Sequence, residues 1–244
     1  MTVYLTSSPC VDGADRPILN PANGFLEHLR SDLPENPRCV FVASDPEDHF
    51  GTCEFGSHMF QAFAEAGMPF SQYVVLDGYS AEFAADLIFD SDLIILAGGH
   101  VPTQNRFFND IGLGTLLQDY DGVILGISAG SMNAAGEVYV QPEEPGEGVD
   151  PDFERFLPGL GLTHVNICPH YQKVKDNILD GMRLFEDITY PDSMDHTFYA
   201  LPDGSYFYIH GGETLLCGES YRLRNGIMEM LTLDGEHAFL SDLE

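Results

Sequence analysis

Short apolar runs recur along the first half of the chain, and the stretches between them carry apolar residues at helical spacing. The predicted strands are residues 3–5, 39–43, 73–76, 93–96 and 122–127. The predicted helices are residues 23–32, 56–66, 81–89 and 107–119. Runs of four to six apolar residues suit strands that are buried on both faces, whereas the helical stretches show one apolar face. This alternation predicts an α/β fold with a mostly parallel sheet and helices on both of its faces.

The pattern changes after about residue 195. Turn signals at 202–204 (PDG) and 224–226 (RNG) border runs of alternating character, such as 205–209 and 214–217. Turns of this kind between alternating runs predict antiparallel hairpins, which we expect at the edge of the sheet. The acidic, Pro/Gly-rich segment 141–152 is expected to be a loop. The length fits one domain spanning residues 1–244.

Charge narrows the possible partners. The chain has 39 acidic and 10 basic residues, a formal net charge of −29. Nucleic-acid binding needs basic residues to displace counterions from phosphates, and anionic membranes repel a protein of this charge. No apolar run approaches the roughly 18 residues of a membrane span, and the first residues lack a signal-peptide pattern. Five cysteines without C-x-x-C spacing favour a reduced environment. We expect a cytoplasmic protein without nucleic-acid or membrane partners.

The sequence Gly-Ile-Ser-Ala-Gly at 126–130 is the main candidate for chemistry. It follows the predicted buried strand 122–127 and precedes the helix-compatible stretch 131–137. A serine in a tight strand-to-helix turn is exposed at the end of a sheet, where it can act as a nucleophile. The alternative is a glycine-rich helix start in which Ser128 only caps the helix.

A pair of glycines, Gly98 and Gly99, ends the preceding predicted strand. Because the carboxyl ends of parallel strands meet at one edge of a sheet, the N–H groups of Gly99 and Ala129 could converge on one oxygen. They are the candidate oxyanion donors. The alternative is an ordinary tight turn.

Among the nine histidines, His170 is the candidate base because it ends the apolar run 165–170. A serine nucleophile needs an imidazole within hydrogen-bond reach and an acceptor that orients the imidazole. A structural histidine is the alternative. The residues leave the acid open among Glu143, Glu144 and Glu147. The His- and Asp-containing segments 45–49 and 192–196 lack the spacing of metal ligands, so no metal is expected.

At these positions the chain resembles the peptidase E and cyanophycinase family of serine peptidases. The matching segments are LTSSP at 5–9, LAGGH at 96–100, GISAGSMNAA at 126–135, ICPHY at 167–171 and ALPDGSYF at 200–207. The resemblance implies a three-layer α/β sandwich, flavodoxin-like and similar to class I glutamine amidotransferases. It also implies Ser128 as nucleophile, His170 as base, Gly99 and Ala129 as oxyanion donors, and no cofactor. It points to Glu143 as the acid, with Glu144 in reserve.

The resemblance implies hydrolysis of small peptides, including aspartyl or β-aspartyl peptides. His100 stands where relatives have Asn or Asp, and His100, Gln104 and Arg183 are the candidate substrate-binding residues. Arg106, Lys173 and Lys175 are further cations that could hold a substrate carboxylate. Two other functions stay open: a binding protein that has lost turnover, and an amidase or esterase. We expect a monomer or a homodimer.

Overall fold

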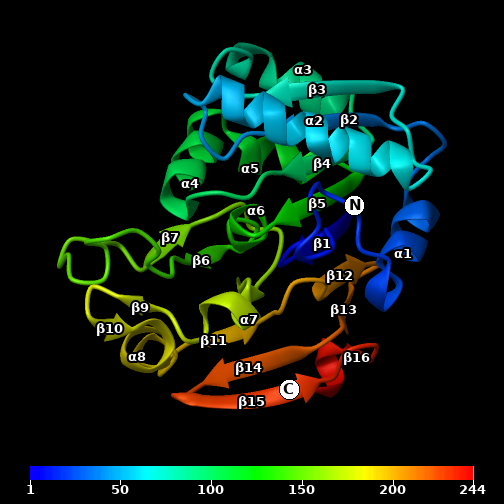
Figure 1. Cartoon of the computed structure of the whole chain (residues 1–244). Helices are drawn as coiled ribbons and strands as arrows, with labels where there is room; N and C mark the ends of the chain where they lie inside the picture. Colours follow the sequence, from blue (N-terminus) through cyan, green and yellow to red (C-terminus); the bar gives the residue numbers. More distant parts are fainter. Residues whose placement is uncertain (244) are drawn as a thin grey trace.

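The computed structural model describes residues 1–243, and its centre is an eight-stranded sheet (Figure 1). In spatial order its strands are β16 (His237–Phe239), β13 (Glu213–Cys217), β12 (Tyr206–His210), β1 (Thr2–Thr6), β5 (Val123–Ile127), β4 (Leu93–Leu96), β2 (Arg38–Val42) and β3 (Gln72–Leu76). The five strands from β1 to β3 run parallel, and the three from β12 to β16 are added antiparallel. The predicted mostly parallel α/β sheet is therefore confirmed.

Helices cover both faces of this sheet. The α-helices are α1 (Phe25–Asp32), α2 (His49–Glu65), α3 (Ala84–Phe89), α4 (Val101–Asp110), α5 (Leu113–Leu116), α6 (Ala129–Met132), α7 (Tyr171–Val174) and α8 (Tyr190–Asp192). Short 3-10 turns lie at Ala22–Gly24, Ala81–Phe83, Leu117–Asp119 and Leu240–Asp242, and a π-helical segment lies at Leu184–Thr189.

Alternation along the buried strands explains the three layers. In β2, Cys39 and Phe41 pack in a core with α1 and α2, whereas Val40 and Val42 pack in a core with α3, α4 and α6. Successive side chains of a strand point to opposite faces, so a strand covered on both faces must be apolar throughout. The continuous apolar runs of the sequence follow from this requirement.

A second, four-stranded sheet lies at the end of the molecule opposite β3 (Figure 1). Its order is β15 (Ile227–Thr232), β14 (Ser220–Arg224), β11 (Thr197–Ala200) and β8 (Asn166–Cys168). The expectation that the late hairpins extend the edge of the main sheet is thus correct for the β12–β13 hairpin and for β16, which pairs with β13. The hairpin of β14 and β15 belongs to the second sheet, and so does the strand that precedes His170.

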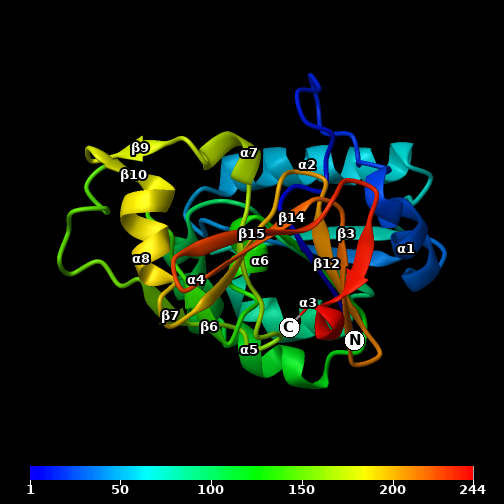
Figure 2. The same cartoon turned by 90° about the horizontal axis from the view of Figure 1, so that it is seen from below.

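Two small hairpins lie beside these sheets. They are β6 (Glu137–Tyr139) with β7 (Phe156–Pro158), and β9 (Ile178–Leu179) with β10 (Met182–Arg183). The acidic loop 141–152 joins β6 to β7 and lies beside the β9–β10 hairpin (Figure 2). The Asp180 carboxylate, in the turn of that hairpin, accepts hydrogen bonds from the N–H groups of Gly146 and Gly148. The loop contains neither helix nor strand, as expected, but side chains hold it in place.

Helix lengths differ from the predictions in three places. The helix predicted at 56–66 begins earlier, at His49. The predicted helix at 107–119 begins earlier, at Val101, and is broken by Gly112 at φ 65° into α4 and α5. The helix expected at 131–137 is only the four-residue α6, because the chain enters strand β6 at Glu137. Within residues 1–243, no helix combines the length and the apolar character that a membrane crossing requires.

Truncating a core side chain should measure how strongly the α2 layer stabilises the sheet. Phe41 is fully buried, and its ring meets that of Phe55 edge-to-face at 5.4 Å. Phe41→Ala should lower the free energy of unfolding by about 3–5 kcal/mol, because it removes buried apolar surface and leaves a cavity. Urea unfolding measures the change. The control is Phe50→Ala, since Phe50 is 80% exposed and its truncation should change stability by less than about 0.5 kcal/mol. Equal losses in both variants would contradict this packing.

Candidate active site

Ser128 lies in the turn between β5 and α6, with φ 50° and ψ −110°. Positive φ is unfavourable for a residue with a side chain, and such strain is concentrated at functional sites. Close packing maintains the turn: a Cβ at Gly130 would lie 2.3 Å from the carbonyl oxygen of Leu96. The N–H of Ser128 donates to the carbonyl oxygen of Thr6 at 3.0 Å. Gly130 is therefore required, because a side chain at this position would collide with the neighbouring strand β4.

His170 reaches Ser128 from the second sheet. It follows β8 and adopts a left-handed conformation, φ 56°, directly before α7. Its N–H donates to Ser7 Oγ at 2.7 Å, which holds the backbone. Its ring nitrogen Nε2 lies 3.0 Å from Ser128 Oγ. This distance is within the reach that a general base needs.

Asp203 occupies the far side of the imidazole. Its Oδ1 lies 2.7 Å from His170 Nδ1 and accepts a second hydrogen bond from Ser7 Oγ at 2.8 Å. Lys173 Nζ lies 2.8 Å from Oδ2 of the same carboxylate, whose side chain is 3% exposed. A hydroxyl, an imidazole and a buried carboxylate in this order form the arrangement that activates a serine.

The electrostatics keep Asp203 charged. Burial alone would raise the pKa of its carboxyl, but the hydrogen bonds from His170 and Lys173 outweigh burial and hold the pKa well below its usual range. The contact of Nδ1 with an ionised carboxylate favours the tautomer that carries its proton on Nδ1. Nε2 is then free to accept the proton of Ser128.

The acid expected from the sequence has to be corrected. Glu143, Glu144 and Glu147 were the candidates, but Asp203 contacts His170 Nδ1. Asp203 belongs to the PDG segment, which predicts a turn equally well without any chemistry. The signal that could have identified it is its place directly after strand β11, which pairs in parallel with the strand that leads to His170.

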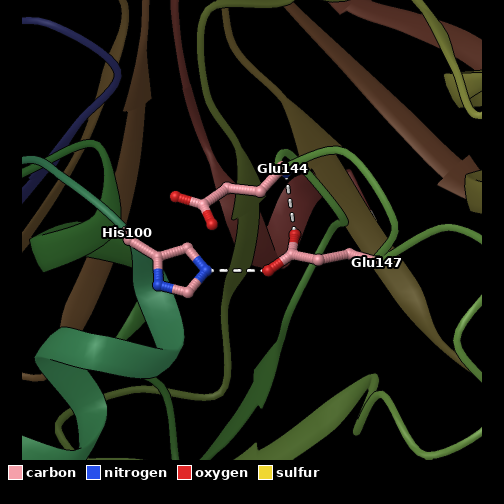
Figure 3. A group of neighbouring side chains, drawn as sticks. All are labelled: His100, Glu144 and Glu147. Carbon is pink, nitrogen blue, oxygen red and sulfur yellow. Dashed lines mark hydrogen bonds and ion pairs between the residues drawn. The ribbon is translucent and has the colours of Figure 1, made fainter.

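Glu144 and Glu147 instead lie in a neighbouring loop beside His100 (Figure 3), and Glu143 belongs to the same loop. Glu147 Oε1 lies 2.8 Å from His100 Nε2, and its Oε2 accepts the N–H groups of Glu143 and Glu144, both at 2.9 Å. Possible ligand atoms of His100, Glu144 and Glu147 lie within 4.8 Å of one another. Both carboxylate oxygens of Glu147 already accept hydrogen bonds. We therefore interpret these contacts as a link that holds the 141–152 loop to His100.

Gly98 and Gly99 lie against the serine turn, as expected from the sequence. A Cβ at Gly98 would lie 3.5 Å from the Cβ of Ser128, and one at Gly99 would lie 2.4 Å from Ser44 Oγ. Only glycine therefore fits at position 99. The N–H groups of Gly99 and Ala129 stay the candidate oxyanion donors.

A cavity of about 240 Å³ opens beside Ser128 and His170. Slightly more than half of its wall is apolar, and this part includes Val101, Met132, Val174, Ile178, Leu179 and Leu184. Its polar lining includes Gln141, Glu143 and Asn177. Desolvation raises the pKa of the Glu143 carboxyl; Glu147 adds to the rise, whereas His100 and the N–H of Val101 oppose it.

The expected substrate-binding residues do not line this cavity. Gln104 is fully buried: its Nε2 donates to the carbonyl oxygen of Ala97 at 2.7 Å, and its Oε1 accepts from Asn133. Arg183 lies on the surface, with its guanidinium 2.6 Å from Asp187. His100 pairs with Glu147. These assignments are corrected: Gln104 supports α4, Arg183 forms a surface ion pair, and His100 anchors the loop.

Comparison with solved structures supports the fold. A 1.5 Å crystal structure of a "Putative Peptidase E Protein" from Listeria monocytogenes EGD-e superposes with a TM-score of 0.57 and 16% sequence identity. The match covers 95% of this chain and 98% of that one. At this identity the likeness shows the shared fold. No curated protein sequence matches the chain.

The comparison with protein families is more specific. The model of peptidase family S51 matches residues 9–217, which include Ser128, His170 and Asp203. The resemblance to peptidase E that the sequence segments indicated is confirmed by this match. The chain belongs to peptidase family S51.

Proposed function

We propose that this peptidase is a serine hydrolase of small peptides, with Ser128 as nucleophile, His170 as general base and Asp203 as the orienting acid. The observation that carries the proposal is the continuous chain of contacts, 3.0 Å from Ser128 Oγ to His170 Nε2 and 2.7 Å from His170 Nδ1 to Asp203. Membership of family S51 supports the same reaction class.

The mechanism begins when Ser128 Oγ attacks the peptide carbonyl carbon and His170 Nε2 takes the hydroxyl proton. The negative charge moves to the carbonyl oxygen, where the N–H groups of Gly99 and Ala129 stabilise it. When the C–N bond breaks, the imidazolium donates its proton to the departing amine and an acyl-Ser128 ester is left. A water molecule, deprotonated by His170, attacks the ester. The acid product leaves and the proton returns to Ser128.

Small substrates fit the size of the site. Pockets for drug-sized ligands usually measure about 300–1,000 Å³, whereas the cavity beside Ser128 measures about 240 Å³. Asp180 and His100 hold the 141–152 loop, and this loop contributes Gln141 and Glu143 to the wall. We therefore expect a di- or tripeptide to be cut faster than a folded protein.

Covalent labelling tests the nucleophile. A fluorophosphonate probe should label the wild-type protein on Ser128, and Ser128→Ala should abolish the labelling, because the probe reacts with an activated serine. The attached mass is located by peptide mapping. Ser57→Ala is the control, since Ser57 lies exposed on α2. Labelling that persists in Ser128→Ala would refute the assignment.

The rate of the same labelling tests the acid. Asp203→Asn should slow labelling by about 10³- to 10⁴-fold, because the imidazole then loses the carboxylate that fixes its tautomer. Asp12→Asn is the matched control, since Asp12 also pairs with Lys173, at 2.7 Å, but does not contact His170. An equal slowing in both variants would mean that the pairing of Lys173, and not the contact with His170, is what matters.

The depressed pKa of Asp203 predicts how stability depends on pH. A carboxyl whose folded-state pKa lies below its unfolded value contributes stability above the unfolded value, about 3.9, and loses this contribution as pH falls through the folded-state pKa. The wild-type protein should therefore exceed Asp203→Asn in unfolding free energy at about pH 5. The difference should narrow below about pH 4. Urea unfolding across this range measures it, and parallel curves for the two proteins would contradict the prediction.

A further inference from the structure

We propose that the cavity beside Ser128 selects substrates that carry a cationic group on an apolar stem, that Glu143 is the residue that selects it, and that aspartyl side chains are disfavoured. The inference rests on the proposed function, because it treats this cavity as the place where the substrate binds. It reverses the charge preference expected from the sequence.

The charges of the lining carry the inference. Among residues 1–243, Glu143 is the only carboxylate on the cavity wall, and no lysine or arginine lines the cavity. An aspartyl side chain placed there would meet a like charge and no counterion, which costs binding energy. A positive group would gain a charge-assisted hydrogen bond to Glu143. The apolar part of the wall suits the carbon chain that carries such a group.

None of the basic residues near the site lines the cavity, which holds for the exposed Lys175 as well as for Lys173, Arg183 and Arg106. Lys173, three residues after His170, pairs with Asp203 and Asp12 at 2.8 and 2.7 Å. Arg183 pairs with Asp187. Arg106 lines a different cavity, between α4 and the 150–158 segment. None of these cations is therefore placed to receive a substrate carboxylate next to Ser128.

The backbone of Glu143 is held at the cavity by its neighbours. Glu147 binds its N–H at 2.9 Å, and Glu147 is itself fixed by His100 at 2.8 Å (Figure 3). His100 directly follows Gly99. The contacts of Glu147 with Glu143 and His100 therefore connect Glu143 to the proposed oxyanion donor. Glu143 is an exposed residue, yet its surroundings raise the pKa of its carboxyl, chiefly through desolvation, and a bound cation would act against this rise.

The surface charge acts in the same direction. A net charge of −29 attracts cationic peptides to the protein and raises their rate of encounter with it. The same charge repels acidic peptides and lowers their rate of encounter. Salt screens the long-range part of this effect beyond roughly 8 Å. The contact at Glu143 is short-ranged, so selectivity should persist at high salt.

Binding to Ser128→Ala, which cannot turn over, tests the inference. Four ligands are compared by calorimetry at about pH 6.5, where the amines are protonated: leucinamide, Nα-acetyl-lysinamide, N-acetyl-leucinamide and N-acetyl-aspartic acid amide. At least one of the two cationic ligands should bind about tenfold or more tightly than the neutral one, and the acidic ligand should bind most weakly. The first two ligands distinguish an N-terminal ammonium from a basic side chain as the source of the charge.

Adding Glu143→Gln to Ser128→Ala should abolish the preference for the cation, whereas adding Glu144→Gln should preserve it. Glu144 is the matched control because it is a neighbouring exposed carboxylate that does not line the cavity. Loss of the preference in both double variants would overturn the assignment to Glu143. Equal binding of cationic and neutral ligands to Ser128→Ala, or tightest binding of the acidic ligand, would overturn the inference as a whole.

Protection experiments separate this result from the proposed function. In the wild-type protein, the tightest cationic ligand should slow fluorophosphonate labelling of Ser128, and N-acetyl-aspartic acid amide should not. Failure of the probe to label Ser128 refutes the nucleophile but leaves the binding comparison valid. Labelling that only the acidic ligand slows refutes the charge preference but leaves the nucleophile in place.

Discussion

The site depends on the hydrogen-bonded register of β1 between its two neighbours. Thr6 pairs with Ile127 of the parallel strand β5 and with Tyr206 of the antiparallel strand β12. Ser128 follows directly on one side, and the N–H of Ser7 bonds to the carbonyl oxygen of Ser205 on the other. A slip by one residue would turn every side chain of β1 to the opposite face and break this alignment. Ser7, the residue that holds both His170 and Asp203, would then no longer reach either.

The second sheet supplies the remaining partners. Strand β8 leads to His170 and pairs in parallel with β11, which leads to Asp203. Asp203 lies in the short connection by which the chain passes from β11 in the second sheet to β12 in the central sheet. The two sheets therefore meet at the imidazole. Lys173 adds a positive charge beside the buried carboxylate, and without such partners a buried charge is strongly destabilising.

Features that depend on local sequence were predictable. Buried parallel strands appear as continuous apolar runs, and the tight turn at Ser128 requires glycines on both sides, so both leave a pattern in a few consecutive residues. Asp203 leaves no such pattern, because its contact with His170 depends on the parallel pairing of β11 with β8, and the two residues lie 33 positions apart in sequence. The expectation for Arg183 was wrong for a different reason. Its guanidinium pairs with Asp187, only four residues further along the chain, so proximity to His170 in sequence did not place it at the site.

The meeting of two sheets at one imidazole also affects when the protein can become active. Along the chain the serine comes first, at residue 128, the histidine follows at 170, and the carboxylate comes last, at 203. Strand β12 follows this carboxylate and ends at His210. N-terminal segments generally fold first during synthesis. A nascent chain that has completed only the parallel half of the sheet therefore has the serine turn without its base or its acid. Assembly of the last third of the chain thus completes the proposed catalytic arrangement.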